Sequence, residues 1–223
     1  MASNFQNKLP VVISIGVNVA GKTFSYIQLS RLQSWENLLN KINPQNQKNP
    51  SKNLSLMFPL MQSQNLEGKF KNILEQAQQN VNNALNHNCQ FSISDLKDRI
   101  TQSLSNQDWN EVNWAKFWVK EFSRVLGYNQ ENYQLNKLDE YLKQKNSKII
   151  FLIDGLENIF PDLAYDNLQQ TALKALIDNL PNKLSEIRQS NLGLIVFLRR
   201  DFLRYTITQN SQQFENLYKE YRF

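Results

Sequence analysis

Three apolar runs along the chain have the length and composition of buried β-strands. They cover residues 9–16, 148–155 and 191–200. Each run is short, rich in Ile, Val, Leu and Phe, and does not alternate with polar residues, which is typical of strands in a parallel sheet covered on both faces. Residues 53–60 predict a further strand, which we expect to stop at Pro59 because proline cannot donate a hydrogen bond to a neighbouring strand.

The segments between these runs have helical periodicity. A helix is expected from Gly21, with apolar residues on one face (Phe24, Ile27, Leu32, Trp35 and Leu39). It ends in an amide-rich loop that contains Pro44 and Pro50. Further helices are predicted over residues 66–86, 94–105, 109–126, 132–145 and 166–188, and over part of the segment after residue 201. Ser94 is expected to cap the helix of residues 94–105, and Ser211 is a candidate cap in the last segment. Pro181 is expected to kink or divide the helix of residues 166–188.

Strands that alternate with helices predict an α/β fold of three layers, in which helices flank a parallel sheet and the crossovers are right-handed. We expect one domain over residues 1–223, with a helical insert over residues 61–145 because this separation exceeds what a compact core needs. No fifth strand and no C-terminal helical lid follow residues 191–200. We therefore expect either an abbreviated core or the front part of a larger protein.

Composition and charge narrow the class of protein. Of the 223 residues 41% are hydrophobic, which excludes a wholly disordered chain. The net charge of +5 comes from basic residues spread along the sequence, densest at Arg199, Arg200 and Arg204, so contact with nucleic acid stays open without being indicated. Trp109, Trp114 and Trp118 recur at helical spacing, which favours a core cluster over a base-stacking platform.

The chain holds one cysteine, Cys89, and one histidine, His87. This excludes an internal disulfide, and it argues against a Cys/His zinc site or a His-dependent nucleophile. The N-terminus has no basic-then-apolar signal region, and no apolar run reaches the roughly 18 residues that a membrane span needs. We expect a cytoplasmic protein without membrane contact.

The strongest motif follows the first strand. Residues 16–23, GVNVAGKT, fit G-x-x-x-x-G-K-[ST] at every fixed position. The glycines allow a sharp turn and close approach to an anion, and successive N–H groups then face the anion at the start of the next helix. The predicted phosphate-binding residues are Gly16, Asn18, Val19, Ala20, Gly21, Lys22, Thr23 and the flanking Phe24. Lys22 is expected to reach the β- and γ-phosphates, and the Thr23 hydroxyl to ligate Mg²⁺.

A second motif ends the apolar run over residues 149–153. Asp154 follows it directly, as in the Walker B pattern of several apolar residues and an aspartate. At the carboxyl end of a central strand, this side chain lies where open α/β sheets bind ligands. We expect Asp154 to orient the water shell of Mg²⁺. A strand-ending turn aspartate remains the alternative.

These residues resemble those of the P-loop NTPase superfamily. The resemblance covers residues 9–25, 148–160 and 191–204 and points to the additional-strand (ASCE) division, near the AAA+, STAND and KAP branches, whose Walker B strands often continue Asp-Gly-Leu or Asp-Asp-Leu and an acidic residue. Val17 occupies the position of an extra lysine in the ParA/MinD type, which argues against that group.

The resemblance also suggests catalytic residues. Many ASCE proteins carry a glutamate directly after the Walker B aspartate to orient the attacking water, but here that position is Gly155. Glu157 is therefore the candidate base, with Asp162 behind it, and the departure at Gly155 concerns hydrolysis rather than nucleotide binding. Arg199 or Arg200 could sense the γ-phosphate or act as an arginine finger toward a neighbouring subunit; the alternative is a strand end in which an arginine pairs with Asp201.

The combined motifs predict an Mg-ATP-binding module that couples nucleotide binding and hydrolysis to a conformational or assembly change, with a homo-oligomer or a partner protein as the other component. The alternatives are a nucleotide-dependent interaction module with little hydrolysis and a small-molecule kinase. ATP is preferred from the family resemblance. Residues 136–139, NKLD, match a guanine-recognition motif, although they lie before the Walker B strand and inside a predicted helix. GTP therefore stays an alternative nucleotide.

Overall fold

The computed structural model describes residues 9–17, 21–46, 54–62, 66, 68–87, 91–187 and 190–207. Within them, four parallel strands form one sheet with the order β1-β4-β3-β2. Their bounds are β1 (Val11–Gly16), β2 (Ser55–Met61), β3 (Lys148–Ile153) and β4 (Leu192–Arg199). The predicted α/β class with a parallel sheet is confirmed.

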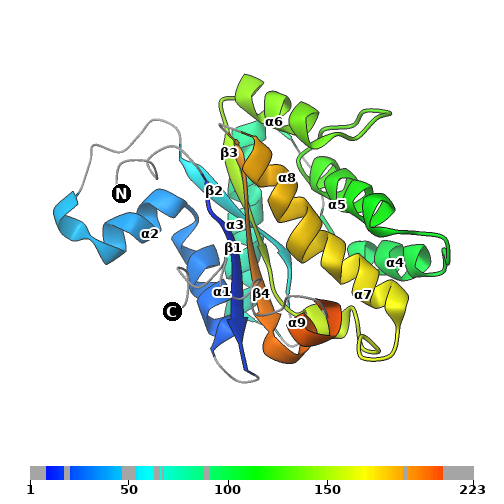
Figure 1. The fold of residues 1–223 in the computed structure, drawn as a ribbon. Helices are drawn as coiled ribbons and strands as arrows, with labels where there is room; N and C mark the ends of the chain where they lie inside the picture. The colour runs from blue at the N-terminus through cyan, green and yellow to red at the C-terminus, as the bar shows by residue number, and fades with distance from the viewer. Residues whose placement is uncertain are drawn as a thin grey trace.

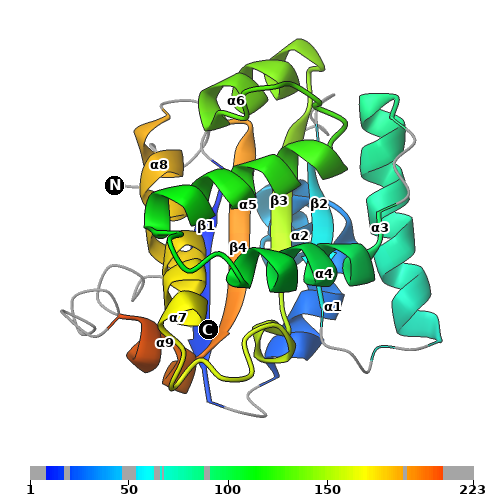
Figure 2. The ribbon, with the colours of Figure 1, turned by 90° about the vertical axis from the view of Figure 1, so that its right-hand side faces the viewer.

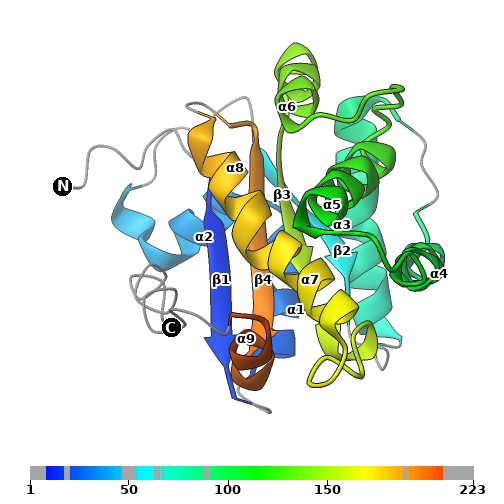
Figure 3. The same cartoon turned by 45° about the vertical axis from the view of Figure 1, so that its right-hand side comes forward.

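Helices flank this sheet (Figures 1 to 3). One face is covered by α5, α7 and α8, the opposite face by α1 and α2, and α3 lies beside β2 (Figure 2). The helix bounds are α1 (Lys22–Leu32), α2 (Trp35–Ile42), α3 (Lys69–Leu85), α4 (Ile93–Leu104), α5 (Glu111–Val125), α6 (Leu135–Gln144), α7 (Asn167–Lys174), α8 (Leu180–Glu186) and α9 (Arg200–Thr206). None of these helices is long and apolar enough to cross a bilayer.

The strands have apolar side chains on both faces, so the sheet separates two hydrophobic clusters. Toward α1, Ile150 and Ile195 pack with Tyr26 and Ile27. Toward α5, the ring of Phe122 stacks on Phe151 of β3 at a centroid distance of 4.2 Å. Burial on both faces is the reason that the strands read as continuous apolar runs rather than alternating ones.

The tryptophans at helical spacing are largely core residues, as predicted. Trp114 and Trp118 are fully buried, and the Trp118 indole N–H donates to the carbonyl oxygen of Ala172, 3.1 Å away. Trp109 is only partly exposed, and its ring packs edge-on against Trp114 at 5.1 Å.

The single helix predicted from Gly21 is wrong, because it is two helices. Gln33 has a left-handed backbone (φ 64°) that ends α1, and the hydroxyl of Ser34 then accepts from the N–H of Asn37 to cap α2. The predicted apolar face runs across this break, so its outer members are not buried: Phe24 is 66% and Leu39 48% exposed.

Two other local predictions are corrected. Pro59 lies inside β2, opposite Leu152, instead of ending the strand. This is tolerated because β2 is an edge strand and its register shifts between Pro59 and Met61, which are the settings where strands accept proline. The cap of α4 is Ser92, whose hydroxyl accepts from the N–H of Asp95, and not Ser94.

Pro181 divides the predicted helix of residues 166–188 as expected, through a π-helical turn over Ala175–Asn179 between α7 and α8. The predicted Ser211 cap lies outside the described residues. The predicted insert over residues 61–145 stays a prediction; α5, within it, packs directly on the sheet through Phe122.

Candidate functional site

The carboxyl ends of three neighbouring strands meet at one edge of the sheet. In the register of β1 and β4, Gly16 is opposite Arg199, and in that of β3 and β4, Ile153 is opposite Val196. The residues that follow β1 and β3 therefore emerge on either side of β4. This brings the two predicted motifs to the same edge of the sheet although they are far apart in sequence.

The loop between β1 and α1 turns through a glycine. Gly16 is the last residue of β1, and Gly21 has φ 73°, a left-handed conformation that favours glycine, directly before α1. The first turn of α1 has no side-chain cap and no acidic residue. Its first N–H groups are thus free of side-chain acceptors among the described residues. Asn18, Val19 and Ala20 lie outside the described residues.

Lys22, the first residue of α1, folds back over the loop. Its ammonium donates to the carbonyl oxygen of Val17 at 2.6 Å and to that of Gly16 at 3.3 Å. Burial lowers the pKa of Lys22, while the nearby charges of Asp154 and Glu157 oppose that shift. The ammonium therefore lies within electrostatic reach of both predicted acidic residues.

Thr23 joins the two motifs directly. Its hydroxyl donates a hydrogen bond of 2.7 Å to Oδ2 of Asp154. This arrangement follows from the fold: Thr23 is in the first turn of α1 after β1, and Asp154 is the first residue after β3. The sequence predicted that these two oxygens would lie together, and the structure brings them into contact.

Asp154 is a buried carboxyl group with few partners. It is 3% exposed, and its own N–H donates to the carbonyl oxygen of Met61 at the end of β2. Burial raises the pKa of Asp154 and the charge of Glu157 raises it further, whereas the hydrogen bonds from Thr23 and from the Gly155 backbone and the charge of Lys22 lower it. The ionised carboxylate is therefore stabilised less than burial demands, and a cation beside it would relieve that cost.

Glu157 belongs to a short 3-10 turn, Leu156–Asn158, which begins after Gly155. Gly155 has φ 74°, so the chain makes a sharp turn immediately after Asp154. Glu157 is partly exposed, and its charge acts on the pKa values of Asp154 and Lys22. The structure brings Glu157 near the two motifs, while Asp162 is exposed.

The arginine pair at the end of β4 separates into two environments. Arg199 makes a forked ion pair with Asp201, with Nε at 3.0 Å and Nη2 at 2.6 Å from the two carboxylate oxygens. This hydrogen bonding raises the pKa of Arg199 and lowers that of Asp201. The structure thus shows the alternative to a sensor role, a strand end in which an arginine pairs with Asp201, and Arg199 also contributes to lowering the pKa of Lys22. Arg200 is exposed.

Two apolar side chains beside the loop face solvent. Phe24 is 66% and Val17 58% exposed, although both belong to residue types that are usually buried. They flank Lys22 and Thr23 in the sequence. An exposed aromatic ring next to a polar site is a candidate contact for a flat ligand group.

Sequence reasoning missed two polar groups near Asp154. The hydroxyl of Tyr26 is fully buried without a hydrogen-bond partner, and burial together with the charge of Asp154 raises its pKa well above the usual range. The buried Oε1 of Gln62, which directly follows β2, also lacks a partner. Because the predicted strand was expected to stop at Pro59, Gln62 was not recognised as the polar residue that follows β2; Tyr26 carries no comparable signal.

The Thr23–Asp154 pair fits a hard divalent cation. Mg²⁺ prefers oxygen ligands and keeps several of its waters, so it takes only one or two carboxylates from the protein. No group of three or more His, Cys, Asp or Glu residues able to hold a metal occurs in the described part of the chain. One buried carboxylate next to a hydroxyl is the donor set that a magnesium site completed by phosphate oxygens requires.

Comparison of the chain with protein-family models, with curated proteins and with solved structures finds no match.

Proposed function

We propose that this protein is an Mg-ATP-binding P-loop NTPase module that couples the state of its nucleotide to a conformational or assembly change. The observation that carries the proposal is the 2.7 Å hydrogen bond between Thr23 and Asp154. Many strands end in aspartate, and a Gly-Lys-Thr turn can arise by chance. A contact between the two at the carboxyl edge of a parallel sheet is what an NTPase site needs.

The loop of residues 16–23 binds the phosphates in this proposal. Its N–H groups and the start of α1 supply partial positive charge, and Lys22 adds a full one. Lys22 now donates to the carbonyl oxygens of Gly16 and Val17, and it exchanges these bonds for phosphate oxygens when nucleotide binds. A charged hydrogen bond of this kind contributes about 1.5–3 kcal/mol.

Thr23 and Asp154 hold the cation. Mg²⁺, when bound, neutralises charge on the β- and γ-phosphate oxygens. The Thr23 hydroxyl is a direct ligand and the buried Asp154 carboxylate fixes the water shell. The burial of Asp154 supports this role, because a buried carboxylate whose pKa is raised gains from a nearby cation.

Glu157 is the residue proposed to orient the attacking water, and Arg199 the residue proposed to respond to the γ-phosphate. Both lie close enough to influence the pKa of Lys22. Arg199 is engaged with Asp201, so nucleotide binding that draws Arg199 away would break this ion pair at the start of α9. That exchange is the proposed link between nucleotide and conformation.

The proposal is tested by calorimetric titration of Mg-ATP into the wild type, Lys22→Ala and the matched control Lys41→Ala, whose lysine is exposed on α2. We expect Lys22→Ala to weaken binding by at least about tenfold, from loss of a charged hydrogen bond, and Lys41→Ala to bind as the wild type does. Equal affinity of all three proteins, or no binding by the wild type, overturns the proposal.

A second candidate is a nucleotide-dependent interaction module with little turnover. It is favoured by Gly155, which places no carboxylate directly after Asp154. Turnover measured for the wild type and Glu157→Gln separates the two candidates. A wild-type rate that is lost in Glu157→Gln while binding persists supports the NTPase, and a negligible wild-type rate with intact binding supports the interaction module.

A further inference from the structure

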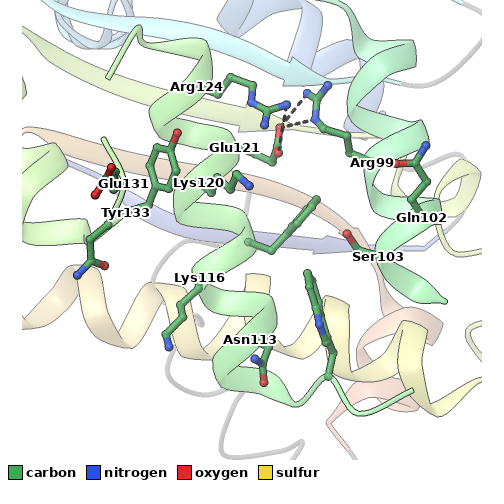
Figure 4. Close-up of a pocket in the computed structure, with 13 residues that line it drawn as sticks. Arg99, Gln102, Ser103, Asn113, Lys116, Lys120, Glu121, Arg124, Glu131 and Tyr133 are labelled. Atoms are coloured by element: carbon green, nitrogen blue, oxygen red, sulfur yellow. Dashed lines mark hydrogen bonds and ion pairs between the residues drawn. The ribbon is translucent and has the colours of Figure 1, made fainter. Parts of the chain in front are cut away.

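The outer surface of α5 carries a hollow of about 550 Å³ that contains none of the residues of the phosphate-loop site. α5 lines it along its exposed face, α4 forms one side, and residues 131–133 form the other (Figure 4). Its volume is within the range of about 300–1,000 Å³ that is usual for ligand sites.

Basic side chains dominate the hollow. Lys116, Lys120 and Arg124 follow each other at intervals of four residues on α5, so they form one stripe with a rise of about 6 Å per step. Arg99 adds a cation from α4. Against these four cations the lining contains two carboxylates, Glu121 and Glu131, which leaves an excess of positive charge.

A buried carboxylate fixes one arginine of the hollow and attracts a second. Glu121 is 1% exposed, and its Oε2 accepts from Nε and Nη2 of Arg99 at 2.9 and 2.8 Å. Arg124 approaches the other oxygen at 3.9 Å (Figure 4). The guanidinium group of Arg99 is therefore held in place at the hollow, which lowers the entropic cost of ordering it around a ligand. Lys116 and Lys120 are both exposed.

Aromatic rings accompany these cations. Trp109 and Tyr133 line the hollow and are partly exposed, and the buried ring of Phe117 lies 6.1 Å from that of Trp109. The ammonium of Lys120 is 5.9 Å from the centre of the Tyr133 ring. The hollow thus offers flat apolar surfaces next to positive charges; Trp109 and Tyr133 lie just before α5 and α6, while Lys116, Lys120 and Arg124 are carried by α5.

We propose that the hollow on α5 binds single-stranded nucleic acid without strong sequence preference. Such a strand alternates anionic phosphates with flat bases, and proteins bind it with cations along a groove and aromatic rings between them. An acidic peptide would satisfy the cations but leave Trp109 and Tyr133 without a flat partner. The net charge of +5 favours a polyanion of this kind.

The test is fluorescence anisotropy of a labelled oligothymidine of about 15 nucleotides, long enough for one site, in the presence of the full chain. The variant Lys116→Gln/Lys120→Gln removes two charges from the hollow. The matched control Lys137→Gln/Lys143→Gln removes two charges from α6, and neither of its lysines lines the hollow. The exposed pair of Lys137 with Glu140 contributes little to stability, so the control is expected to fold normally.

We expect the wild type and the control to bind alike and the hollow variant to bind about tenfold more weakly. For the hollow variant, the slope of log affinity against log salt concentration is expected to be smaller in magnitude by about 1.4, because two phosphate contacts are lost. Absence of wild-type binding, or an equal loss in both variants, overturns the proposal. Binding of polyglutamate but not of oligothymidine, lost in the hollow variant, also overturns it and assigns the hollow to an acidic peptide.

The aromatic contribution has its own variant. Tyr133→Leu keeps an apolar side chain but removes the ring, and Tyr133→Phe keeps the ring. We expect Tyr133→Leu to weaken binding of the oligonucleotide by about fivefold or more and Tyr133→Phe to bind as the wild type does. Equal affinity of both variants and the wild type contradicts stacking and overturns the nucleic-acid assignment.

Discussion

The hydroxyl of Thr23 donates to the carboxylate of Asp154 across 131 positions of sequence. The parallel sheet makes this contact, because β1 and β3 flank β4 and release their next residues at the same edge. One oxygen of the pair sits at the start of a helix and the other is buried at the end of a strand. The pair is also where the proposed cation would bind. For variants of either residue, the effect on ligand affinity can therefore be measured separately from the effect on the free energy of unfolding.

Thr23→Val should weaken Mg-ATP binding while leaving the fold intact. Valine has nearly the shape of threonine but no hydroxyl, so the cation loses a ligand and Asp154 loses its hydrogen bond. We expect affinity to fall about tenfold in the presence of Mg²⁺, and Thr23→Ser to keep most of it. Calorimetry with Mg²⁺ and with EDTA checks this: a deficit that is the same under both conditions contradicts a role at the cation.

Asp154→Asn should make the protein without nucleotide more stable at neutral pH. Burial raises the pKa of Asp154 in the folded state, so ionisation disfavours folding. A carboxyl group whose pKa is raised by folding contributes its full stabilisation at pH values below its unfolded-state pKa of about 4. This stabilisation is lost as the pH rises through the folded-state pKa. Asparagine carries no such charge and can still accept from Thr23.

We therefore expect the free energy of unfolding of Asp154→Asn to exceed that of the wild type at pH values above the raised pKa, with the difference shrinking as the solution becomes acidic. Urea unfolding at several pH values measures this difference. The same variant should lose Mg-dependent ATP binding. A difference that grows toward acid would contradict the stated cause of the pKa shift.

Much of the sheet was predictable because its strands are buried on both faces and read as uninterrupted apolar runs, as in Ile149 to Ile153. The meeting of Thr23 and Asp154 at one edge was predictable from the two motifs and parallel strand direction, whereas their contact also depends on β1 and β3 flanking β4. The break between α1 and α2 was not predictable from apolar spacing, because it depends on the left-handed backbone of Gln33 and the capping hydroxyl of Ser34.

The surroundings of the site were harder to predict. The hydroxyl of Tyr26 is close enough to Asp154 to be affected by its charge because α1 packs on the sheet, and the apolar spacing of the predicted helix did not include Tyr26. Pro59 was misleading because its tolerance depends on β2 being an edge strand, a property of the sheet order that local sequence does not encode.

Phe24→Ala should affect ligand binding more than folding. The ring is 66% exposed, so its removal is expected to change the free energy of unfolding by no more than about 0.5 kcal/mol. It follows Thr23 directly, and we expect it to contact the nucleoside part of the ligand. Affinity for Mg-ATP should fall about fivefold, while affinity for inorganic triphosphate, which has no base, stays unchanged. Parallel calorimetry with the two ligands decides the matter, since an equal loss for both places the ring elsewhere.

Gly155→Glu, which introduces the acidic residue that the family resemblance leads one to expect at this position, should not create a better catalyst. Gly155 has φ 74°, a left-handed conformation that costs a residue with a Cβ about 1–2 kcal/mol. A glutamate there therefore strains the turn that carries both Asp154 and Glu157. Asparagine tolerates this conformation better, so Gly155→Asn is the matched control.

We expect Gly155→Glu to lose about 1–2 kcal/mol of unfolding free energy, Gly155→Asn to lose less, and neither to exceed the turnover of the wild type. Denaturant unfolding and steady-state phosphate release measure the two effects separately. A stable Gly155→Glu protein with increased turnover would show that the turn accepts a side chain and that position 155, rather than 157, is where the water-orienting carboxylate belongs.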